Sequence, residues 1–184
     1  VTRTEAQVLA QHGQAIGEQV ARWLGSAPAM VELGAGNCAK ASRLFPLLRP
    51  SAFVAVDISV EYLRGALDAL QREHPQMDLV GLGLDFSAGF ELPPDLPGLG
   101  RSGSRLVFYP GSSIGNFAPD AALQLLRDMR AAAQGGALLI GVDLVKATPV
   151  LEAAYDDELG VTAAFNLNLL HHLNRLLGSD FAVP

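Results

Sequence analysis

Few features of this sequence would cross-link or anchor the chain. Its 184 residues include a single cysteine, Cys38, which excludes an internal disulfide. Hydrophobic residues make up 49% of the chain, yet no run approaches the roughly 20 uninterrupted apolar residues of a membrane helix. No basic start followed by an apolar core marks a signal peptide. We therefore expect a cytoplasmic protein that spans no membrane.

Positive charge is also scarce. The chain carries 13 Lys and Arg against 19 Asp and Glu, a net charge of −6 at pH 7, and its Lys and Arg residues form no cluster. This balance argues against nucleic acid as the main partner. The partner we expect is a small-molecule substrate. The length suits one well-buried core, so we expect a single domain over residues 1–184. Because the sequence opens at Val1 without a methionine, we also expect it to be a piece of a longer protein.

What the sequence does have is a strand, a glycine turn and a helix in direct succession. Ala29–Leu33 reads as a buried strand, Gly34 and Gly36 form a Gly-x-Gly turn, and residues 38–48 follow a helical pattern. Glycines let the backbone turn sharply and approach a ligand, although many helices without a ligand also start at glycine. Asp57 ends the next apolar run, where its carboxylate can accept both hydroxyls of a ribose. The pattern therefore predicts a ribose-containing ligand.

Two ligand classes fit this unit, and Glu32 decides between them. Residues 34–39 satisfy the dinucleotide fingerprint, with alanine in the third small position. A dinucleotide would place its pyrophosphate at this turn, where the Glu32 carboxylate would repel it. S-adenosylmethionine carries a cationic ammonium and sulfonium instead, which a carboxylate attracts. The charges favour S-adenosylmethionine; the alternative is that Glu32 does not reach the ligand.

Strand and helix patterns alternate along most of the chain. We expect a helix within residues 1–25, further strands over 78–84, 105–109 and 137–143, a proline- and glycine-rich loop over 87–104, and helices within 148–178. The predicted inner faces are Val8, His12, Ile16, Val20 and Trp23 in the first helix and Leu123, Leu126, Met129 and Ala133 in the helix after Pro119. The fold class predicted is α/β: a doubly wound, mostly parallel, Rossmann-like sheet of about five strands with helices on both faces, its core over residues 29–143, plus C-terminal helices.

Polar and aromatic residues follow two further strands of the predicted sheet. Asp85 can accept a hydrogen bond from an exocyclic amino group and Phe86 can pack against a base, or the pair can serve as a turn cap and a core aromatic. After the strand that ends at residue 109, Gly111 offers an uncrowded backbone and Asn116 offers both a donor and an acceptor, unless Asn116 only caps a helix. In a doubly wound sheet, ligands bind outside these strand ends.

Other reactive side chains carry weaker signals. The Tyr155 hydroxyl can reach the crevice or only the surface. His171 and His172 are adjacent on a helix and point about 100° apart, so they do not easily share a metal, and no metal site is predicted. Cys38 is expected to be a small buried side chain, and no Ser/His/Asp or Cys/His grouping is visible.

Taken with the tail, these residues resemble a known family. From Thr2 to the end the chain resembles the histidine Nα-methyltransferases of ergothioneine biosynthesis, class I enzymes that trimethylate L-histidine to hercynine with S-adenosylmethionine. The most specific parts are residues 111–116, 142–146, 154–157 and 160–166. The family's C-terminal segment, which grips the imidazole, is absent from this sequence.

The resemblance implies a role for each candidate residue. Those for the donor are Gly34 and Lys40 at its amino-acid end, Asp57 at the ribose, and Asp85 with Phe86 at the adenine. For the substrate, Gly111 would lie near the histidine amino group, while Asn116 and Tyr155 would bind its carboxylate. Three readings stay open beside this one: a methyltransferase for another histidine derivative or small amine, an NAD(P)-dependent oxidoreductase, and a non-catalytic module.

Overall fold

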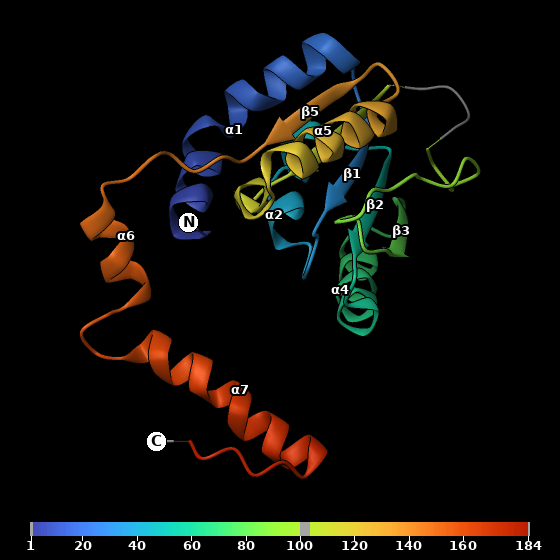
Figure 1. Cartoon of the computed structure of the whole chain (residues 1–184). Helices are drawn as coiled ribbons and strands as arrows, with labels where there is room; N and C mark the ends of the chain where they lie inside the picture. Colours follow the sequence, from blue (N-terminus) through green and yellow to red (C-terminus); the bar gives the residue numbers. More distant parts are fainter. Residues whose placement is uncertain (1, 100–103, 184) are drawn as a thin grey trace. The chain divides into compact units, whose positions relative to one another are not determined.

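The computed structural model describes residues 2–99 and 104–183 (Figure 1). The chain divides into two compact units, Val1–Asp143 and Leu144–Pro184, and each is described by itself. The first unit contains the whole predicted core, 29–143, and the second contains the predicted helices over 148–178.

A five-stranded parallel sheet forms the centre of the first unit. Its strands are β1 (Ala29–Leu33), β2 (Ala52–Asp57), β3 (Asp78–Gly83), β4 (Arg105–Tyr109) and β5 (Ala137–Ile140), in the order β3-β2-β1-β4-β5. In β1, Val31 is in register with Val54 of β2 and with Val107 of β4. The glycine turn after β1 therefore lies between the carboxyl ends of β2 and β4, where ligands bind in such sheets.

Helices cover both faces of the sheet. On one face, α1 (Thr2–Leu24), α2 (Ala39–Ser42), α3 (Phe45–Leu48) and α4 (Val60–Glu73) contribute to a core with Met30, Phe53 and Phe108. On the other face, α5 (Pro119–Ala133) packs in a core with Val31, Val54 and Val107. Because side chains alternate between the faces along each strand, β1, β2 and β4 are apolar on both sides. The predicted α/β, doubly wound, Rossmann-like fold is confirmed.

Two predicted elements have different bounds in the structure. The helix expected over 38–48 is broken into α2 and α3, because Pro46 lacks an N–H and its ring clashes with the preceding turn of a continuous helix. The strand expected over 137–143 ends at Ile140. Beyond it, the Asp143 amide donates to Ser112 Oγ at 2.8 Å, so this segment follows the loop after β4 instead of the sheet. The predicted loop has no helix or strand over residues 87–99, and residues 100–103 lie outside the described part of the chain.

The predicted inner face of α1 was partly wrong. Ile16 and Val20 do pack inward, but Trp23 is 77% exposed, and Val8 and His12 are exposed as well. The helix is rotated because its glycines lie on the packed side: a Cβ added at Gly13 would come 2.8 Å from Leu47 Cδ1 of α3. A prediction based on apolar side chains misses this contact, because it depends on a glycine, which has no side chain.

The inner face of α5 is also rotated from the prediction. Met129 and Ala133 are buried as expected, whereas Leu123 and Leu126 are exposed. The other buried positions are Leu125 and Ala132, which fit the same helical spacing. Both faces of α5 carry leucines, so its sequence pattern alone allows either orientation.

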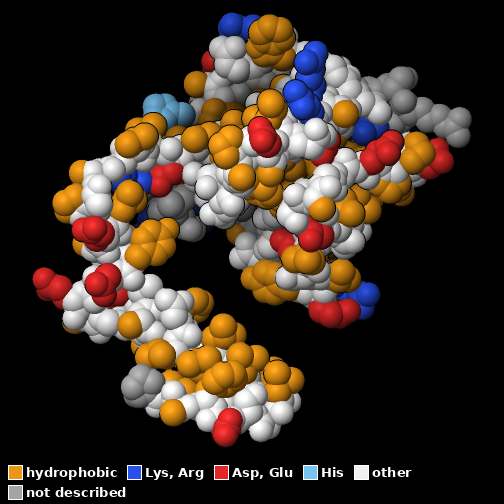
Figure 2. Space-filling view, viewed as in Figure 1, with side chains coloured by type: hydrophobic (Ala, Val, Ile, Leu, Met, Phe, Trp, Pro, Cys, Tyr) orange, Lys and Arg blue, Asp and Glu red, His pale blue; other side chains and the backbone are white. Residues whose placement is uncertain are grey.

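The second unit consists of α6 (Thr148–Tyr155) and α7 (Val161–Leu177). The Asp157 carboxylate accepts hydrogen bonds from the backbone amides of Val161 and Thr162, each at 2.9 Å, which fixes the start of α7. Those bonds hold the pKa of Asp157 at about 2. Exposed apolar side chains gather along α7, Phe165 and Leu169 among them (Figure 2). Among the described residues, none of the helices has both the length and the apolar character needed to span a bilayer.

Candidate functional site

The glycine turn after β1 has left-handed backbone geometry at both glycines. Gly34 has φ +69° and Gly36 has φ +54°. The Gly34 and Ala35 amides both donate to the Val56 carbonyl, at 2.9 and 3.1 Å, so the turn is held against the end of β2. Cys38 also has a positive φ, +58°, and precedes the first residue of α2. These conformations favour glycine, which explains the Gly-x-Gly pattern without a ligand and leaves the turn open to one.

Asp57 fixes the same turn with both oxygens of its carboxylate. Oδ2 accepts a hydrogen bond from the Gly36 amide at 2.8 Å, and Oδ1 accepts one from the Ser59 amide at 2.9 Å. Each carboxylate oxygen has a further lone pair, so these contacts leave acceptors for ribose hydroxyls. The structure thus brings Asp57 and Gly36 together as the sequence predicts, and adds that Asp57 pre-organises the turn.

Glu32 is buried in β1 on the sheet face that α1 and α2 cover. Its exposed fraction is 0%, and neither of its oxygens has a hydrogen-bond partner among the described residues. Burial raises the pKa of Glu32 from 4.5 to about 8; Lys40 opposes this shift, whereas Glu5 and Asp57 add to it. At neutral pH the group is therefore mainly protonated, and a cation beside it would favour the charged carboxylate.

Asp85 and Phe86 follow β3 at the same edge of the sheet. Asp85 Oδ1 accepts the Ser87 amide at 2.9 Å, and hydrogen bonds with the Ser87 side chain and backbone lower the pKa of Asp85. The Phe86 ring packs edge-on against Tyr109 with ring centroids 5.9 Å apart. A Cβ added at Gly34 would lie 3.7 Å from Phe86 Cζ, so this ring borders the glycine turn. Both alternatives for the pair, turn cap with core aromatic and ligand contact, fit this placement.

The loop after β4 carries the candidate substrate residues. Gly111 has φ +85° and Ser112 has φ +60°, and a short 3-10 helix, η1 (Ser113–Asn116), follows. Asn116 is exposed at the end of η1, and α5 starts after Ala118 with no side-chain cap. The alternative that Asn116 caps the following helix is therefore not what the structure contains.

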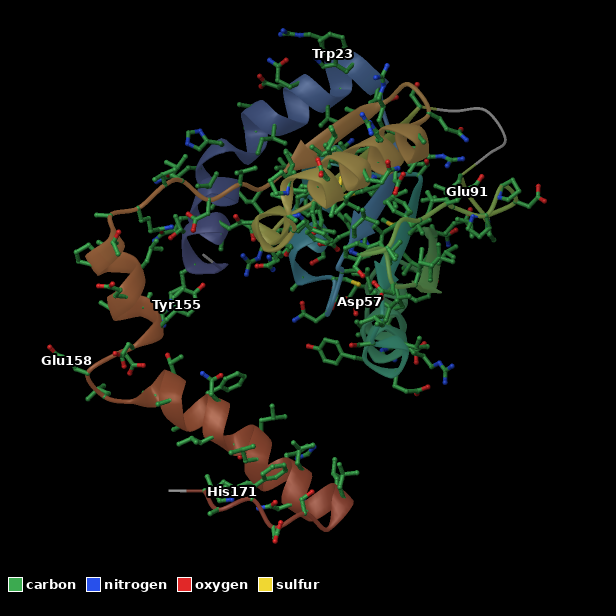
Figure 3. All side chains as sticks on the ribbon, in the orientation of Figure 1. Trp23, Asp57, Glu91, Tyr155, Glu158 and His171 are labelled. Atoms are coloured by element: carbon green, nitrogen blue, oxygen red, sulfur yellow. The ribbon has the colours of Figure 1, made fainter. Side chains whose placement is uncertain are left out.

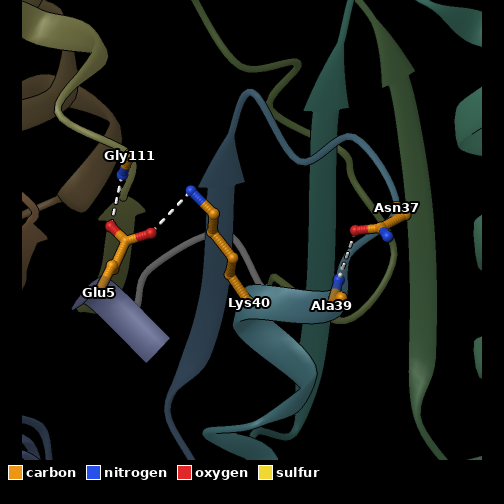
Figure 4. A network of polar contacts seen from close by, with 5 residues as sticks. All are labelled: Glu5, Asn37, Ala39, Lys40 and Gly111. Carbon is orange, nitrogen blue, oxygen red and sulfur yellow. Dashed lines mark hydrogen bonds and ion pairs between the residues drawn. The ribbon is translucent and has the colours of Figure 1, made fainter. Parts of the chain in front are cut away.

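Lys40 of α2 reaches the loop after β4. Its Nζ forms an ion pair with Glu5 Oε2 of α1 at 2.7 Å, and Glu5 Oε1 accepts the Gly111 amide at 2.5 Å (Figure 4). A Cβ added at Gly111 would lie 2.9 Å from Lys40 Nζ. The residue expected at the donor carboxylate and the residue expected at the substrate amine are thus neighbours.

The remaining candidates belong to the second unit or play a packing role. Tyr155, at the end of α6, belongs to the second unit and is 76% exposed; Figure 3 labels it with Asp57 of the first unit. Cys38 is buried as expected, and burial raises the pKa of its thiol to about 12. His172 Nδ1 lies 3.0 Å from the Arg175 guanidinium. No group of metal-ligating side chains occurs within residues 2–99 and 104–183.

Glu5 is the residue that sequence reasoning missed. It lies in a stretch that resembles the histidine methyltransferases, but an acidic residue in the first turn of a helix usually needs no explanation beyond the helix dipole. Its partner Gly111 is 106 positions away along the chain. Only the three-dimensional arrangement reveals the contact.

The chain matches a known protein family. The family described as histidine-specific methyltransferase, SAM-dependent, matches residues 1–184. The chain belongs to this family. The resemblance inferred from the motifs is therefore confirmed.

Individual relatives agree with the family. A histidine N-alpha-methyltransferase of Mycolicibacterium smegmatis is 38% identical over 98% of this chain and 54% of its own length. One of Mycobacterium tuberculosis is 35% identical over 99% of this chain and 55% of its own length. Ergothioneine biosynthesis protein 1 of Neurospora crassa is 28% identical, with 97% and 20% covered. The chain thus spans about half the length of the two bacterial relatives.

Solved structures support the fold. An S-adenosylmethionine-dependent methyltransferase from Clostridium acetobutylicum aligns with a TM-score of 0.54 at 16% identity, over 71% of this chain and 49% of that chain. The sugar N-methyltransferase KedS8 from Streptoalloteichus aligns with a TM-score of 0.53 at 18% identity, over 74% and 49%. At these identities the likeness shows the Rossmann-like methyltransferase fold alone.

Proposed function

We propose that the full-length protein transfers methyl groups from S-adenosylmethionine to the α-amino nitrogen of L-histidine, giving hercynine after three transfers. The observation that carries this proposal is the match to the histidine-specific family along the whole chain. The pre-organised turn between Asp57 and the two glycines supports it. Cytoplasmic location, and no nucleic-acid or membrane partner, remain predictions from composition.

The residues after β1 and β2 suit the donor. Asp57 would hold the ribose with the acceptors left on its carboxylate, and the Lys40 ammonium, ion-paired with Glu5, would meet the donor carboxylate with its N–H donors. Glu32 is a buried carboxyl with no hydrogen-bond partner in the described chain, and a cationic donor bound nearby would favour its charged form. Phe86, beside Gly34, would pack on the adenine. Asp85 would accept a hydrogen bond from the amino group of the adenine.

The loop after β4 would hold the substrate. Gly111 would lie beside the amine, and Asn116, exposed on η1, would bind the carboxylate; the resemblance to the family implies the same role for Tyr155. Fixing the carboxylate leaves the amine with few orientations. Such positioning contributes up to about 7–11 kcal/mol in favourable intramolecular reactions.

The chemistry needs a positioned amine. When bound, the donor supplies an electrophilic methyl group on a sulfonium and leaves as S-adenosylhomocysteine. The ammonium first releases a proton to the solvent, and the residues of this chain would then align the amine lone pair with the carbon–sulfur bond, which breaks as the carbon–nitrogen bond forms. The reaction needs no covalent enzyme intermediate.

Mass spectrometry of L-histidine incubated with S-adenosylmethionine and the full-length protein tests the proposal. We expect one, two and then three methyl groups on the α-nitrogen. Histidine that stays unmodified, while a histidine derivative such as a thiol-bearing one is methylated, would correct the substrate. Binding of NAD in place of S-adenosylmethionine would contradict the function altogether; the family match gives that alternative no support.

A further inference from the structure

A single carboxylate, that of Glu5, joins two parts of the candidate site. Its Oε2 pairs with Lys40 Nζ at 2.7 Å, and its Oε1 accepts the Gly111 amide at 2.5 Å (Figure 4). The Glu5 side chain is 14% exposed, so water competes little for either contact. Three elements distant in sequence, α1, α2 and the loop after β4, meet at this one group.

The backbone leaves just enough room for this contact. A Cβ added at Gly111 would lie 2.9 Å from Lys40 Nζ, and one added at Gly141 would lie 2.7 Å from Glu5 Oε1 and 3.2 Å from the Gly111 amide nitrogen. The distances to Lys40 Nζ and Glu5 Oε1 are below 3.0 Å, so with a Cβ at either glycine these side chains would have to move. The glycines after β4 and β5 therefore permit the carboxylate to sit between them.

The usual role of an acidic residue near a helix start does not account for Glu5. Such a residue interacts with the free amides or the dipole of its own helix. Here the carboxylate contacts Lys40 and Gly111, which belong to other elements. The contact with Gly111 is a charge-assisted hydrogen bond, which is short and directional, and the contact with Lys40 is an ion pair, so both partners are held by the same carboxylate.

We propose that Glu5 is a positioning residue that aligns the donor subsite with the substrate loop. The inference rests on the proposed function, in which Lys40 meets the donor carboxylate and Gly111 borders the amine. Lys40 carries its ammonium on a flexible four-carbon stem, and the ion pair with Glu5 fixes where that ammonium lies. Because the same carboxylate holds the Gly111 amide, the amine site is fixed relative to the donor.

The test compares Glu5→Gln with Glu18→Gln in the full-length protein. Glu18 is exposed on the same helix, so its replacement changes the charge equally without touching the site. Calorimetry with S-adenosylhomocysteine should give a Kd about tenfold higher for E5Q, from the lost ion pair, and an unchanged Kd for E18Q. The KM for histidine should rise in E5Q as well. Glu5→Asp, too short to reach both partners, should not restore either value.

If Glu5 acts through Lys40, the effect of E5Q on the Kd should depend on whether Lys40 is present. In a Lys40→Met background, adding E5Q should change the Kd for S-adenosylhomocysteine by less than about twofold, because the partner is already gone. Equal effects of E5Q in both backgrounds would overturn the inference. So would E5Q that only lowers the thermal unfolding temperature while Kd and KM stay at wild-type values, since Glu5 would then be structural.

Failure of the proposed function looks different. A wild-type protein that binds S-adenosylhomocysteine but methylates no histidine would contradict the proposed substrate, and the Kd of E5Q would still decide the role of Glu5. A wild-type protein that does not bind S-adenosylhomocysteine would overturn both.

Discussion

At the scale of single residues, the candidate site is built from carboxyl groups in different environments. Asp57 uses both oxygens to hold backbone amides, Glu5 uses both to join α2 to the loop after β4, and Glu32 is buried without a hydrogen-bond partner in the described part of the chain. The first two are fixed by their contacts, whereas the protonation of the third depends on what lies beside it. These differences lead to separate predictions.

Glu32 should make the stability of the ligand-free protein depend on pH. Burial raises its pKa from 4.5 to about 8, so between these values the folded state keeps a proton that the unfolded state has lost. The free energy of unfolding should therefore fall as pH rises through this window, by up to about 1.4 kcal/mol per pH unit from this group, and level off above it. Urea unfolding of wild type and Glu32→Gln across the window measures the difference.

The control for this prediction is Glu18→Gln, which removes an exposed carboxylate from the first unit. Its unfolding curve should follow the pH dependence of the wild type. Parallel curves for wild type and E32Q would mean that Glu32 titrates alike in the folded and unfolded states.

Asn116 should affect catalysis more than stability. Because it is exposed on η1, Asn116→Ala should change the free energy of unfolding by less than about 0.5 kcal/mol. If Asn116 binds the histidine carboxylate, kcat/KM for histidine should fall about tenfold or more, the scale of one lost charge-assisted hydrogen bond. Steady-state kinetics of the full-length protein with saturating donor measures this. An unchanged kcat/KM would remove the proposed role, and Asn116→Asp, which would repel the carboxylate, should be at least as impaired.

At the scale of elements, the sequence predicted what depends on local pattern. The parallel strands, the turn at Gly34 and Gly36, and the carboxylate at the end of β2 all follow from apolar runs and glycine. The faces of α1 and α5 did not, because each helix has apolar residues on more than one side and tertiary contacts choose between them. The pairing of Glu5 with Gly111 joins distant positions, and no local pattern contains it.

Replacing Gly65 and Gly136 by alanine should change the free energy of unfolding in opposite directions. Gly65 is exposed in α4, and a Cβ there would have open space, so Gly65→Ala should raise the free energy of unfolding by about 0.5–1 kcal/mol. A Cβ at Gly136, before β5, would lie 2.1 Å from the Arg105 carbonyl oxygen of β4. Gly136→Ala should therefore lower the free energy of unfolding by about 2–4 kcal/mol. Urea denaturation compares the two, and similar effects would contradict the close approach of β4 and the turn before β5.

At the scale of the whole molecule, an acidic chain presents carboxyl groups at the strand ends where the ligand would bind. The net charge is −6, and Glu5, Glu32, Asp57 and Asp85 all lie in the first unit near those ends or in contact with the loops there. Lys40 is paired with one of them. The charged carboxylates among them favour a ligand with cationic groups and no phosphate, which distinguishes the methyl donor from a dinucleotide.

The preference for one ligand over the other should be measurable as a difference in how much each ligand stabilises the folded protein. A ligand that binds only the folded state at about 100 times its Kd adds about 2.7 kcal/mol to the free energy of unfolding. For a domain of about 150–250 residues, that corresponds to a rise in Tm of about 5–10 °C, and to a smaller rise for a longer chain. S-adenosylhomocysteine should produce such a rise in the full-length protein, and NAD at the same concentration should produce none.

Asp57→Ala, which removes the ribose acceptor and the bond to Gly36, should reduce the rise, while Glu18→Gln should leave it intact. A rise with NAD alone would mean that the carboxyl groups do not select the ligand.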